Sequence, residues 1–303
     1  MSFELTILGS GAAIPTLSRG TTSHYINCHQ RHILIDCGEG TQLQLRKFKI
    51  KFQKITTILI SHLHGDHVFG LPGLISTMQL LGRTQGLKII GPKGLKNLLW
   101  TQLNEVGQKK LFNIEIEELT EGSHGVLFED KCIEIHYFPL NHRVVTFGYF
   151  IQEKPYKRRL LRDKFDQTGV SVSYIQKLIQ GSDITDLDGR VVRSDDVTIP
   201  GKPSKSYAFC SDSAYFTDII PHIRDVDVLY HEATFTEKES NLATETFHST
   251  AKQAATIALK ANAKRLIMGH ISARYYSPEE HLKEATSIFE NAFVAEDGKR
   301  FIL

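Results

Sequence analysis

The run His62-Leu63-His64-Gly65-Asp66-His67 constrains this chain more than any other part of it. It follows an apolar stretch of strand length at 57–60, and the glycine inside it favours a tight turn. A strand would send alternate side chains to opposite faces, whereas a turn lets three imidazoles and one carboxylate converge. Zinc binds these ligand types at about 2.0–2.2 Å. Because four ligands exceed what one open catalytic zinc needs from a single turn, we expect two metals about 3.5–4 Å apart.

Three further residues of metal-binding type each follow a predicted strand. They are His142 after 132–138, Asp212 after 206–210, and His270 after 265–268. A single histidine or aspartate after a strand is more often a capping or surface residue. Beside the six-residue cluster, however, these three are the natural candidates for the remaining ligands of two metals.

The rest of the chain alternates short strands with helices in two halves. Strands are also expected at 3–8, 32–35 and 226–230, and helices at 71–81, 95–104 and 250–261, the last with a capping box formed by Thr250 and Gln253. The segment 152–205 differs, because it has little strand periodicity and dense charge. We therefore expect it to be an insertion in a single α/β domain that spans 1–303.

The bulk composition narrows the classes of partner. A net charge of +2 over 303 residues gives no global attraction to nucleic acid or acidic lipid, so a polyanion site must come from local clusters. Four scattered cysteines, without a Cys-x-x-Cys pair, exclude a zinc ribbon and favour a reducing compartment. No apolar stretch approaches the ~20 residues of a membrane span, and no signal peptide is evident. We expect a soluble, cytoplasmic protein with no membrane partner.

The metal-binding run resembles the signature of the metallo-β-lactamase superfamily, and Asp36-Cys37-Gly38 after a strand fits that fold. Within the superfamily the chain resembles the ribonuclease Z family in its bacterial short form. The motifs that carry this narrower resemblance are Gly-Glu-Gly-Thr-Gln at 38–42, Asn-His-Arg at 141–143, Ser-Asp-Ser at 211–213, His-Glu-Ala-Thr-Phe at 231–235, His-Ser-Thr at 248–250 and His-Ile-Ser-Ala-Arg-Tyr at 270–275. The resemblance implies an α/β fold, the metallo-β-lactamase αββα sandwich, with an inserted flexible arm at 152–205.

The resemblance also implies a role for each site residue. One metal would be held by His62, His64 and His142, the other by Asp66, His67 and His270, with Asp212 bridging both. Asp66 is also the expected general base, and His248 is the expected acid for the departing 3′-oxygen. The supporting residues are Asp36 in a structural or secondary contact, Glu232 orienting His248 or binding backbone amides, and Ser272 and Arg274 at the phosphate.

The activity that the resemblance implies is cleavage of the 3′ trailer from precursor tRNA by a zinc-dependent endoribonuclease. The tRNA would keep a 3′-hydroxyl and the trailer a 5′-phosphate. Two Zn²⁺ per subunit are expected, with Mn²⁺ or another divalent ion as an alternative, in a homodimer.

The expected tRNA contacts are basic. Between Gln152 and Lys164, six basic residues outnumber two acidic ones, a local excess of +4. The tRNA-binding candidates are Lys154, Lys157, Arg158, Arg159, Arg162 and Lys164 in this arm, with Arg19 in the N-terminal loop. Most runs of this kind are solvated charged helices, and that reading stays open.

Two departures from the family pattern and two other functions remain. The loop Pro15-Thr-Leu-Ser-Arg-Gly20 keeps Pro15 and Arg19 but lacks the family's lysine and asparagine, and the arm's Gly-Pro turn is not evident at 170–173. One alternative is a metal-dependent phosphodiesterase acting on small or cyclic nucleotides. Another is an RNA-binding protein with a structural metal site.

Overall fold

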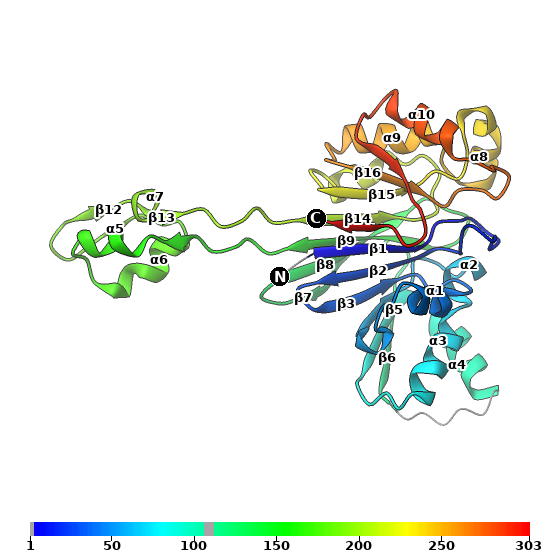
Figure 1. Cartoon of the computed structure of the whole chain (residues 1–303), viewed down its shortest axis with the longest axis horizontal. Helices are drawn as coiled ribbons and strands as arrows, with labels where there is room; N and C mark the ends of the chain where they lie inside the picture. The colour runs from blue at the N-terminus through cyan, green and yellow to red at the C-terminus, as the bar shows by residue number, and fades with distance from the viewer. Residues whose placement is uncertain (1–2, 106–111) are drawn as a thin grey trace. The chain divides into compact units, whose positions relative to one another are not determined.

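The computed structural model describes residues 3–105 and 112–303 and divides the chain into two compact units (Figure 1). The larger unit comprises Met1–Gln152 and Lys205–Leu303, and the smaller unit comprises Glu153–Ser204. The smaller unit occupies the charged segment that the sequence sets apart from the α/β body. Buried apolar side chains cluster within each unit, which gives each the packed interior of a compact fold.

Two sheets of seven strands each form the centre of the larger unit, counted over the residues that the structure describes. The first has the order β18-β1-β2-β3-β4-β5-β6, with β1 Phe3–Gly9, β2 Ser23–Cys28, β3 Arg31–Ile35, β4 Thr57–Leu59, β5 Leu87–Pro92, β6 Ile114–Leu119 and β18 Arg300–Ile302. The second has the order β17-β16-β15-β14-β9-β8-β7, with β7 Gly125–Glu129, β8 Ile133–Leu140, β9 Thr146–Glu153, β14 Ser206–Cys210, β15 Val228–Glu232, β16 Leu266–Gly269 and β17 Ala292–Val294. Strands β3 to β6 are parallel, as are β14 to β17, so the carboxyl ends of each set meet at one sheet edge.

The inner faces of the two sheets pack against each other because alternate residues of their strands are large and apolar. The shared cluster includes Phe3, Leu5 and Ile7 of β1, Phe147, Tyr149 and Ile151 of β9, and Tyr207 and Phe209 of β14. A period of two places each set on one face of its strand. The intervening residues Ala208 and Cys210 belong instead to a second cluster on the outer face.

Helices cover both outer faces and complete the αββα sandwich that the sequence predicts (Figure 1). The helices α1 Thr41–Lys47, α3 Leu71–Leu80 and α4 Leu95–Glu105 pack on the first sheet, and α9 Ala251–Lys260 and α10 Glu279–Thr286 pack on the second. The shorter helical elements are α2 Gly65–Val68, α8 Ser240–Thr246, and the 3₁₀ helices η1 Phe52–Lys54, η3 Thr217–His222 and η4 Glu237–Glu239. On α9 the buried stripe consists of alanines and one isoleucine, so the helix lies close to the sheet.

Local sequence signals are confirmed in most elements. The capping box is present, because Thr250 Oγ1 accepts a hydrogen bond from Gln253 N and Gln253 Oε1 accepts one from Thr250 N. The strand expected at 226–230 lies two residues later, as β15. Asp227 precedes it and serves another purpose, since its Oδ2 accepts hydrogen bonds from the Ser206 amide and hydroxyl. The four cysteines all lie in described residues and form no disulfide. No helix among those residues has the length and apolarity to cross a lipid bilayer.

One histidine of β2 is buried between the sheets. His24 is 0% exposed, its Nδ1 lies 2.7 Å from the hydroxyl oxygen of Tyr207, and its ring packs edge-on against Tyr230. Burial, together with the nearby His67, lowers the pKa of His24 to about 3. The folded chain therefore holds this ring neutral at pH values where an unfolded chain, with a pKa near 6.5, would protonate it.

This difference predicts acid sensitivity. Because the folded pKa lies below the unfolded one, the stabilisation is complete above about pH 6.5 and falls by about 1.4 kcal/mol per pH unit below it. Wild-type protein should lose free energy of unfolding between pH 7.5 and 5.5. In His24→Gln we expect this loss to be about 1.4 kcal/mol smaller, whatever the variant's absolute stability. Urea unfolding of metal-loaded proteins measures this, with the exposed His124→Gln as control. Equal losses in all three proteins would contradict it.

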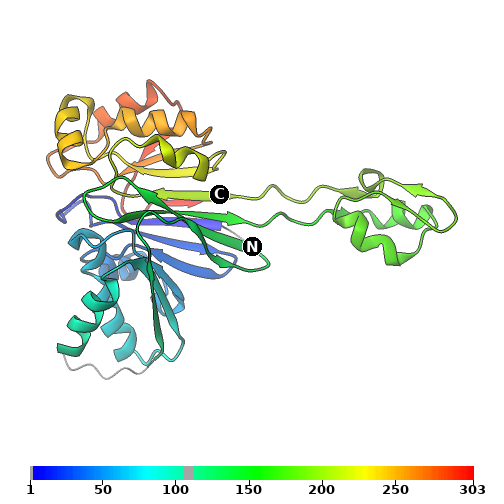
Figure 2. The ribbon, with the colours of Figure 1, turned by 180° about the vertical axis from the view of Figure 1, so that it is seen from behind.

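The smaller unit consists of short elements around a small core (Figure 2). Its elements are β10 Arg159–Leu160, α5 Arg162–Gln167, η2 Val172–Tyr174, α6 Ile175–Ile179, β11 Ile184–Thr185, β12 Val191–Val192, α7 Ser194–Val197 and β13 Thr198–Ile199. Its buried side chains are Phe165, Val170, Leu178, Ile184, Val192 and Val197. The strands pair as β10 with β13 and β11 with β12, so the segment is a folded unit and not a single charged helix.

Candidate metal centre

The candidate metal ligands lie at the ends of strands from both sheets. The turn of His62 to His67 follows β4, and His142 follows β8. Asp212 follows β14, and His270 follows β16, at the carboxyl ends of parallel strands. The topology therefore brings together all seven residues that the sequence singles out as ligands, in two groups that share Asp212.

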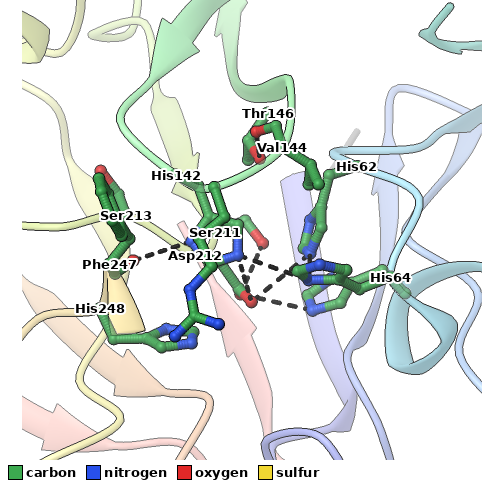
Figure 3. A network of polar contacts seen from close by, with 12 residues as sticks. His62, His64, His142, Val144, Thr146, Ser211, Asp212, Ser213, Phe247 and His248 are labelled. Carbon is green, nitrogen blue, oxygen red and sulfur yellow. Dashed lines mark hydrogen bonds and ion pairs between the residues drawn. The ribbon is translucent and has the colours of Figure 1, made fainter. Parts of the chain in front are cut away.

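The first group consists of His62, His64, His142 and one oxygen of Asp212 (Figure 3). His62 Nε2 lies 3.0 Å from His64 Nδ1 and 3.5 Å from Asp212 Oδ2. His142 Nε2 lies 3.4 Å from His64 Nδ1 and 3.9 Å from Asp212 Oδ2. Each side chain thus places one potential ligand atom close to those of the other three.

The second group consists of Asp66, His67 and His270, and the other oxygen of Asp212 lies near its two histidines. His67 Nε2 lies 3.4 Å from His270 Nε2 and 3.4 Å from Asp66 Oδ2. Asp212 Oδ1 lies 3.4 Å from His67 Nε2 and 3.3 Å from His270 Nε2. Because its two oxygens face different groups, Asp212 is a bridging carboxylate by position.

These spacings fit small divalent cations. Four ligands at about 2.1 Å in tetrahedral directions keep their ligand atoms about 3.4 Å apart, the edge of that tetrahedron. The distances in both groups cluster around this value. Lone pairs held so close repel one another unless a cation or a proton lies between them. The donor set and its spacing therefore fit one divalent ion in each group.

Hydrogen bonds at the second ring nitrogen fix the orientation of three of the candidate histidine ligands. His67 Nδ1 lies 2.7 Å from Asp36 Oδ2, and Asp36 also accepts hydrogen bonds from the amide and hydroxyl of Ser61. His270 Nδ1 lies 2.9 Å from Thr234 Oγ1, and His142 Nδ1 donates to the Phe247 carbonyl at 2.8 Å. With Nδ1 occupied in this way, Nε2 of each ring is free to bind a metal.

The electrostatics of the centre favour positive charge. Burial lowers the pKa of His67, but Asp212, Asp36 and Asp66 outweigh it and raise that pKa well above the ordinary value. The same histidines hold the pKa of Asp212 well below its usual range although burial opposes this. The histidines and carboxylates of the centre therefore stabilise each other's charged forms, except that burial raises the pKa of Asp36.

His248 stands beside the two groups with a carboxylate behind it. Its Nδ1 lies 2.8 Å from Glu232 Oε1, and its side chain is 15% exposed. Burial lowers the pKa of His248, but Glu232 outweighs this and raises it to about 9. Glu232 also accepts hydrogen bonds from the amides of Ser213, Ser249 and Thr234, so it contacts both His248 and backbone amides.

A hollow of about 630 Å³ opens over the centre. Its wall includes the metal-binding side chains His64, Asp66, His142, Asp212 and His270, the charged His248, Arg143 and Glu39, and Ala13, Ile14, Pro15, Thr21, Gly65, Phe69 and Thr246. We call it the catalytic hollow. The charged and metal-ligand-type side chains on its wall suit an anionic substrate more than a purely apolar ligand.

The N-terminal loop reaches the centre through one backbone contact. The Ala13 amide donates to Asp66 Oδ2 at 2.8 Å, from a residue with φ of 58°. Asp297, near the end of the chain, holds this loop, because its carboxylate accepts hydrogen bonds from Ser10 Oγ, Gly20 N and Gln44 Nε2 at 2.7–2.8 Å. Gly38 is needed beside them, since a Cβ there would lie 2.2 Å from the Asp66 carbonyl oxygen. The orientation of Asp66 thus depends on segments from both ends of the chain.

Other predicted site residues lie elsewhere. Among the described residues, the wall of the catalytic hollow does not include Ser272 or Arg274; the Arg274 guanidinium lies over the ring of Phe235. Arg19 is partly buried behind the loop, where burial lowers its pKa despite the nearby Asp297. In the smaller unit Arg158 donates to Thr198 Oγ1 at 2.6 Å and pairs with Asp195, so its guanidinium supports that unit's structure.

Three residues with contacts to the site were not predicted from the sequence. Thr234 contacts both His270 and Glu232; it lies in one of the motifs at 231–235, but the sequence did not suggest these contacts. The contacts through the Ala13 amide and the Phe247 carbonyl carry no sequence signal, because any residue has these groups.

Known proteins resemble the chain in sequence. Residues 3–289 match the family model described as anti-Pycsar protein Apyc1. Ribonuclease Z of Porphyromonas gingivalis is 42% identical over 302 residues, which cover 100% of this chain and 99% of that protein. Ribonuclease Z of Bacteroides fragilis is 42% identical over 296 residues, 98% of this chain and 97% of that protein.

Solved structures agree on the fold. Human tRNase Z, short form, superposes with a TM-score of 0.72 at 27% identity, over 98% of each chain. The metallo-β-lactamase fold protein YhfI of Bacillus subtilis gives a TM-score of 0.70 at 17% identity, over 100% of each chain. The two-sheet sandwich of the larger unit is therefore the metallo-β-lactamase fold.

Proposed function

The chain belongs to the ribonuclease Z family and, through residues 3–289, to the family described as anti-Pycsar protein Apyc1; on that premise we propose that it is a metal-dependent endoribonuclease that removes the 3′ trailer from precursor tRNA. The observation that carries the proposal is the pair of ligand groups that share Asp212, with His248 on the wall of the same hollow. The 42% identity to ribonuclease Z over the whole chain supports precursor tRNA as the substrate, and the similarity to human tRNase Z supports it further. These relatives do not favour the small-nucleotide phosphodiesterase.

We propose Zn²⁺ in each ligand group, with Mn²⁺ as an alternative occupant. His62, His64 and His142 would hold one ion, Asp66, His67 and His270 the other, and Asp212 both. When bound, the ions would supply Lewis-acid charge at the phosphate and lower the pKa of the attacking water.

The chain's own residues would then orient the reactants and move protons. Asp66, oriented by the Ala13 amide, would accept the proton of the water that attacks phosphorus in line. The bond from phosphorus to the 3′-oxygen of the tRNA breaks, and the imidazolium of His248 would protonate that oxygen. Glu232 keeps His248 protonated and holds its ring. The products would be a tRNA with a 3′-hydroxyl and a trailer with a 5′-phosphate.

The decisive experiment incubates the metal-loaded protein with a precursor tRNA that carries a 3′ extension. We expect one cut at the junction of tRNA and trailer, and none with His64→Ala. Absence of a cut under both zinc and manganese would overturn the proposal, and turnover restricted to a cyclic nucleotide would favour the alternative.

We propose that the smaller unit binds tRNA. Of its six candidate cations, Lys157, Arg159, Arg162 and Lys164 are exposed. A shallow hollow of about 430 Å³ is lined by residues 159–164, with three of these cations on its wall. Phosphate groups of tRNA suit such a surface, because backbone contacts supply most of the affinity for nucleic acid.

Removing two of these charges should weaken tRNA binding. For Arg159→Ala/Lys164→Ala we expect KM for precursor tRNA to rise about tenfold, with kcat little changed, and the salt dependence of binding to fall by about two phosphate contacts. The matched control Lys177→Ala/Arg193→Ala removes two exposed cations of the same unit outside residues 159–164. Kinetics at several salt concentrations decide it; equal effects of both pairs would contradict a specific contact surface.

We also propose a homodimer in the cytoplasm. The resemblance to the family supports the dimer, and tRNA as substrate supports the location. Light scattering of the purified protein tests the dimer, and a monomer at micromolar concentration would exclude it.

A further inference from the structure

A second hollow, of about 550 Å³, opens beside the catalytic hollow. Pro92 at the end of β5, Leu140 at the end of β8 and Thr146 at the start of β9 line it, together with Leu63 from the turn that carries the metal ligands. It therefore lies at the same edge of the two sheets as the metal centre. None of the roles assigned above uses it.

Its lining combines apolar surface with positive charge. Leu63, Pro139 and Val144 offer apolar surface, and Val144 is 38% exposed. Lys93 and Arg143 are exposed on its wall, against the single carboxylate of Glu121. An apolar wall with cations beside it suits a nucleotide, whose base has two flat faces and whose phosphate is anionic.

The two hollows are neighbours that share one wall. His142 and Arg143 line both of them, and His142 is one of the metal-binding residues. In Figure 3, Val144 and Thr146 are drawn on the opposite side of the view from His248. A strand whose phosphate lies on the metal centre can therefore have one neighbouring nucleotide in each hollow.

The place of His248 sets the direction of the strand. His248 and Thr246 line the catalytic hollow and not the second one, among the residues that the structure describes. If His248 protonates the departing 3′-oxygen, the tRNA side of the cut lies in the catalytic hollow. The trailer then extends toward the second hollow.

We propose that the second hollow is a binding site for the first trailer nucleotide, with its base against Leu63, Pro139 and Val144 and the following phosphate near Lys93. The proposal rests on the function proposed above. The Thr146 hydroxyl donates to the Val144 carbonyl at 2.9 Å, so it is already engaged and is a poor reader of base edges. The site accordingly selects for the presence of a base more than for its identity.

The base contact is tested with substrates that lack one base. We expect wild-type protein to lose about tenfold in kcat/KM when the first trailer nucleotide is abasic, because the apolar contact of one base with this wall is removed. Val144→Ser should lose most of that discrimination, while its response to an abasic nucleotide on the tRNA side stays as in wild type. Val126→Ser, at a 54% exposed valine of β7, is the matched control and should keep both responses.

The phosphate contact is tested with trailers of different length. Lys93→Gln should lower kcat/KM about three- to tenfold for trailers of two or more nucleotides, since one phosphate contact is removed. A trailer of a single nucleotide lacks the following phosphate, so the variant should match wild type on it.

The outcomes separate the two proposals. If wild-type protein cuts no precursor tRNA, the proposed function fails. If it cuts normally but Val144→Ser changes the response to the tRNA-side base, or changes neither response, the assignment of the second hollow is wrong and the proposed function stands.

Discussion

Replacing Asp212 with alanine is expected to lower the rate of precursor-tRNA cleavage by at least about a thousandfold, or about 4 kcal/mol of barrier. Asp212 is the residue whose two oxygens face both ligand groups, at 3.3–3.5 Å from His62, His67 and His270. Its loss removes a ligand from each group and leaves a buried set of histidines with less negative charge to hold divalent ions. Both metals are therefore affected by one substitution.

The prediction is checked by metal analysis and single-turnover kinetics on the same preparations. Wild-type protein should bind two ions per chain and Asp212→Ala at most one. Asp218→Ala, an exposed aspartate in η3, should retain both metal and rate. A variant without Asp212 that keeps two ions and wild-type cleavage would refute the bridging role.

Replacing His248 with alanine should lower kcat by about a hundred- to ten-thousandfold without loss of metal. The ring lines the catalytic hollow near Asp212 and His270, but its Nδ1 is bound to Glu232 and it belongs to neither of the two proposed ligand groups. Its proposed task is to protonate the departing 3′-oxygen. That task disappears when the leaving atom needs no proton.

A precursor with sulfur in place of that 3′-oxygen provides the test, because a thiolate is a far better leaving group than an alkoxide. We expect His248→Ala to cut the sulfur substrate at nearly the wild-type rate, while it remains slow on the oxygen substrate. His222→Gln replaces a histidine that stacks on Phe138 and should behave as wild type on both. If His248→Ala is equally slow on both substrates, the residue does not act as the acid.

The convergence of the candidate ligands was open to prediction because its signals are local. The turn at 62–67 holds four candidate ligands by itself, and His142, Asp212 and His270 each follow a strand whose apolar pattern is visible. Parallel strands bring their carboxyl ends to one edge, so the positions along the chain imply positions in space. The capping box at Thr250 is present for the same reason, since all its partners lie within one helical turn.

What could not be predicted depends on distant contacts or on backbone groups. Arg158 belongs to a basic run that suggests tRNA binding, yet its guanidinium contacts Thr198, forty residues away in the chain. His24 carries no mark of burial in the sequence, and only the pairing of the two sheets encloses it. Ala13 contributes through its backbone amide and its positive φ, and the identity of the residue as alanine predicts neither.

The anchoring of the N-terminal loop by Asp297 ties the metal centre to the pairing of β1 with β18. Asp297 lies just before β18, and its carboxylate fixes the loop at Gly20. Fraying of β18 would therefore release the loop, and with it the Ala13 amide that contacts Asp66, while the rest of both sheets stays paired. Local opening of this edge strand would lower catalysis before it lowers the stability of the whole fold.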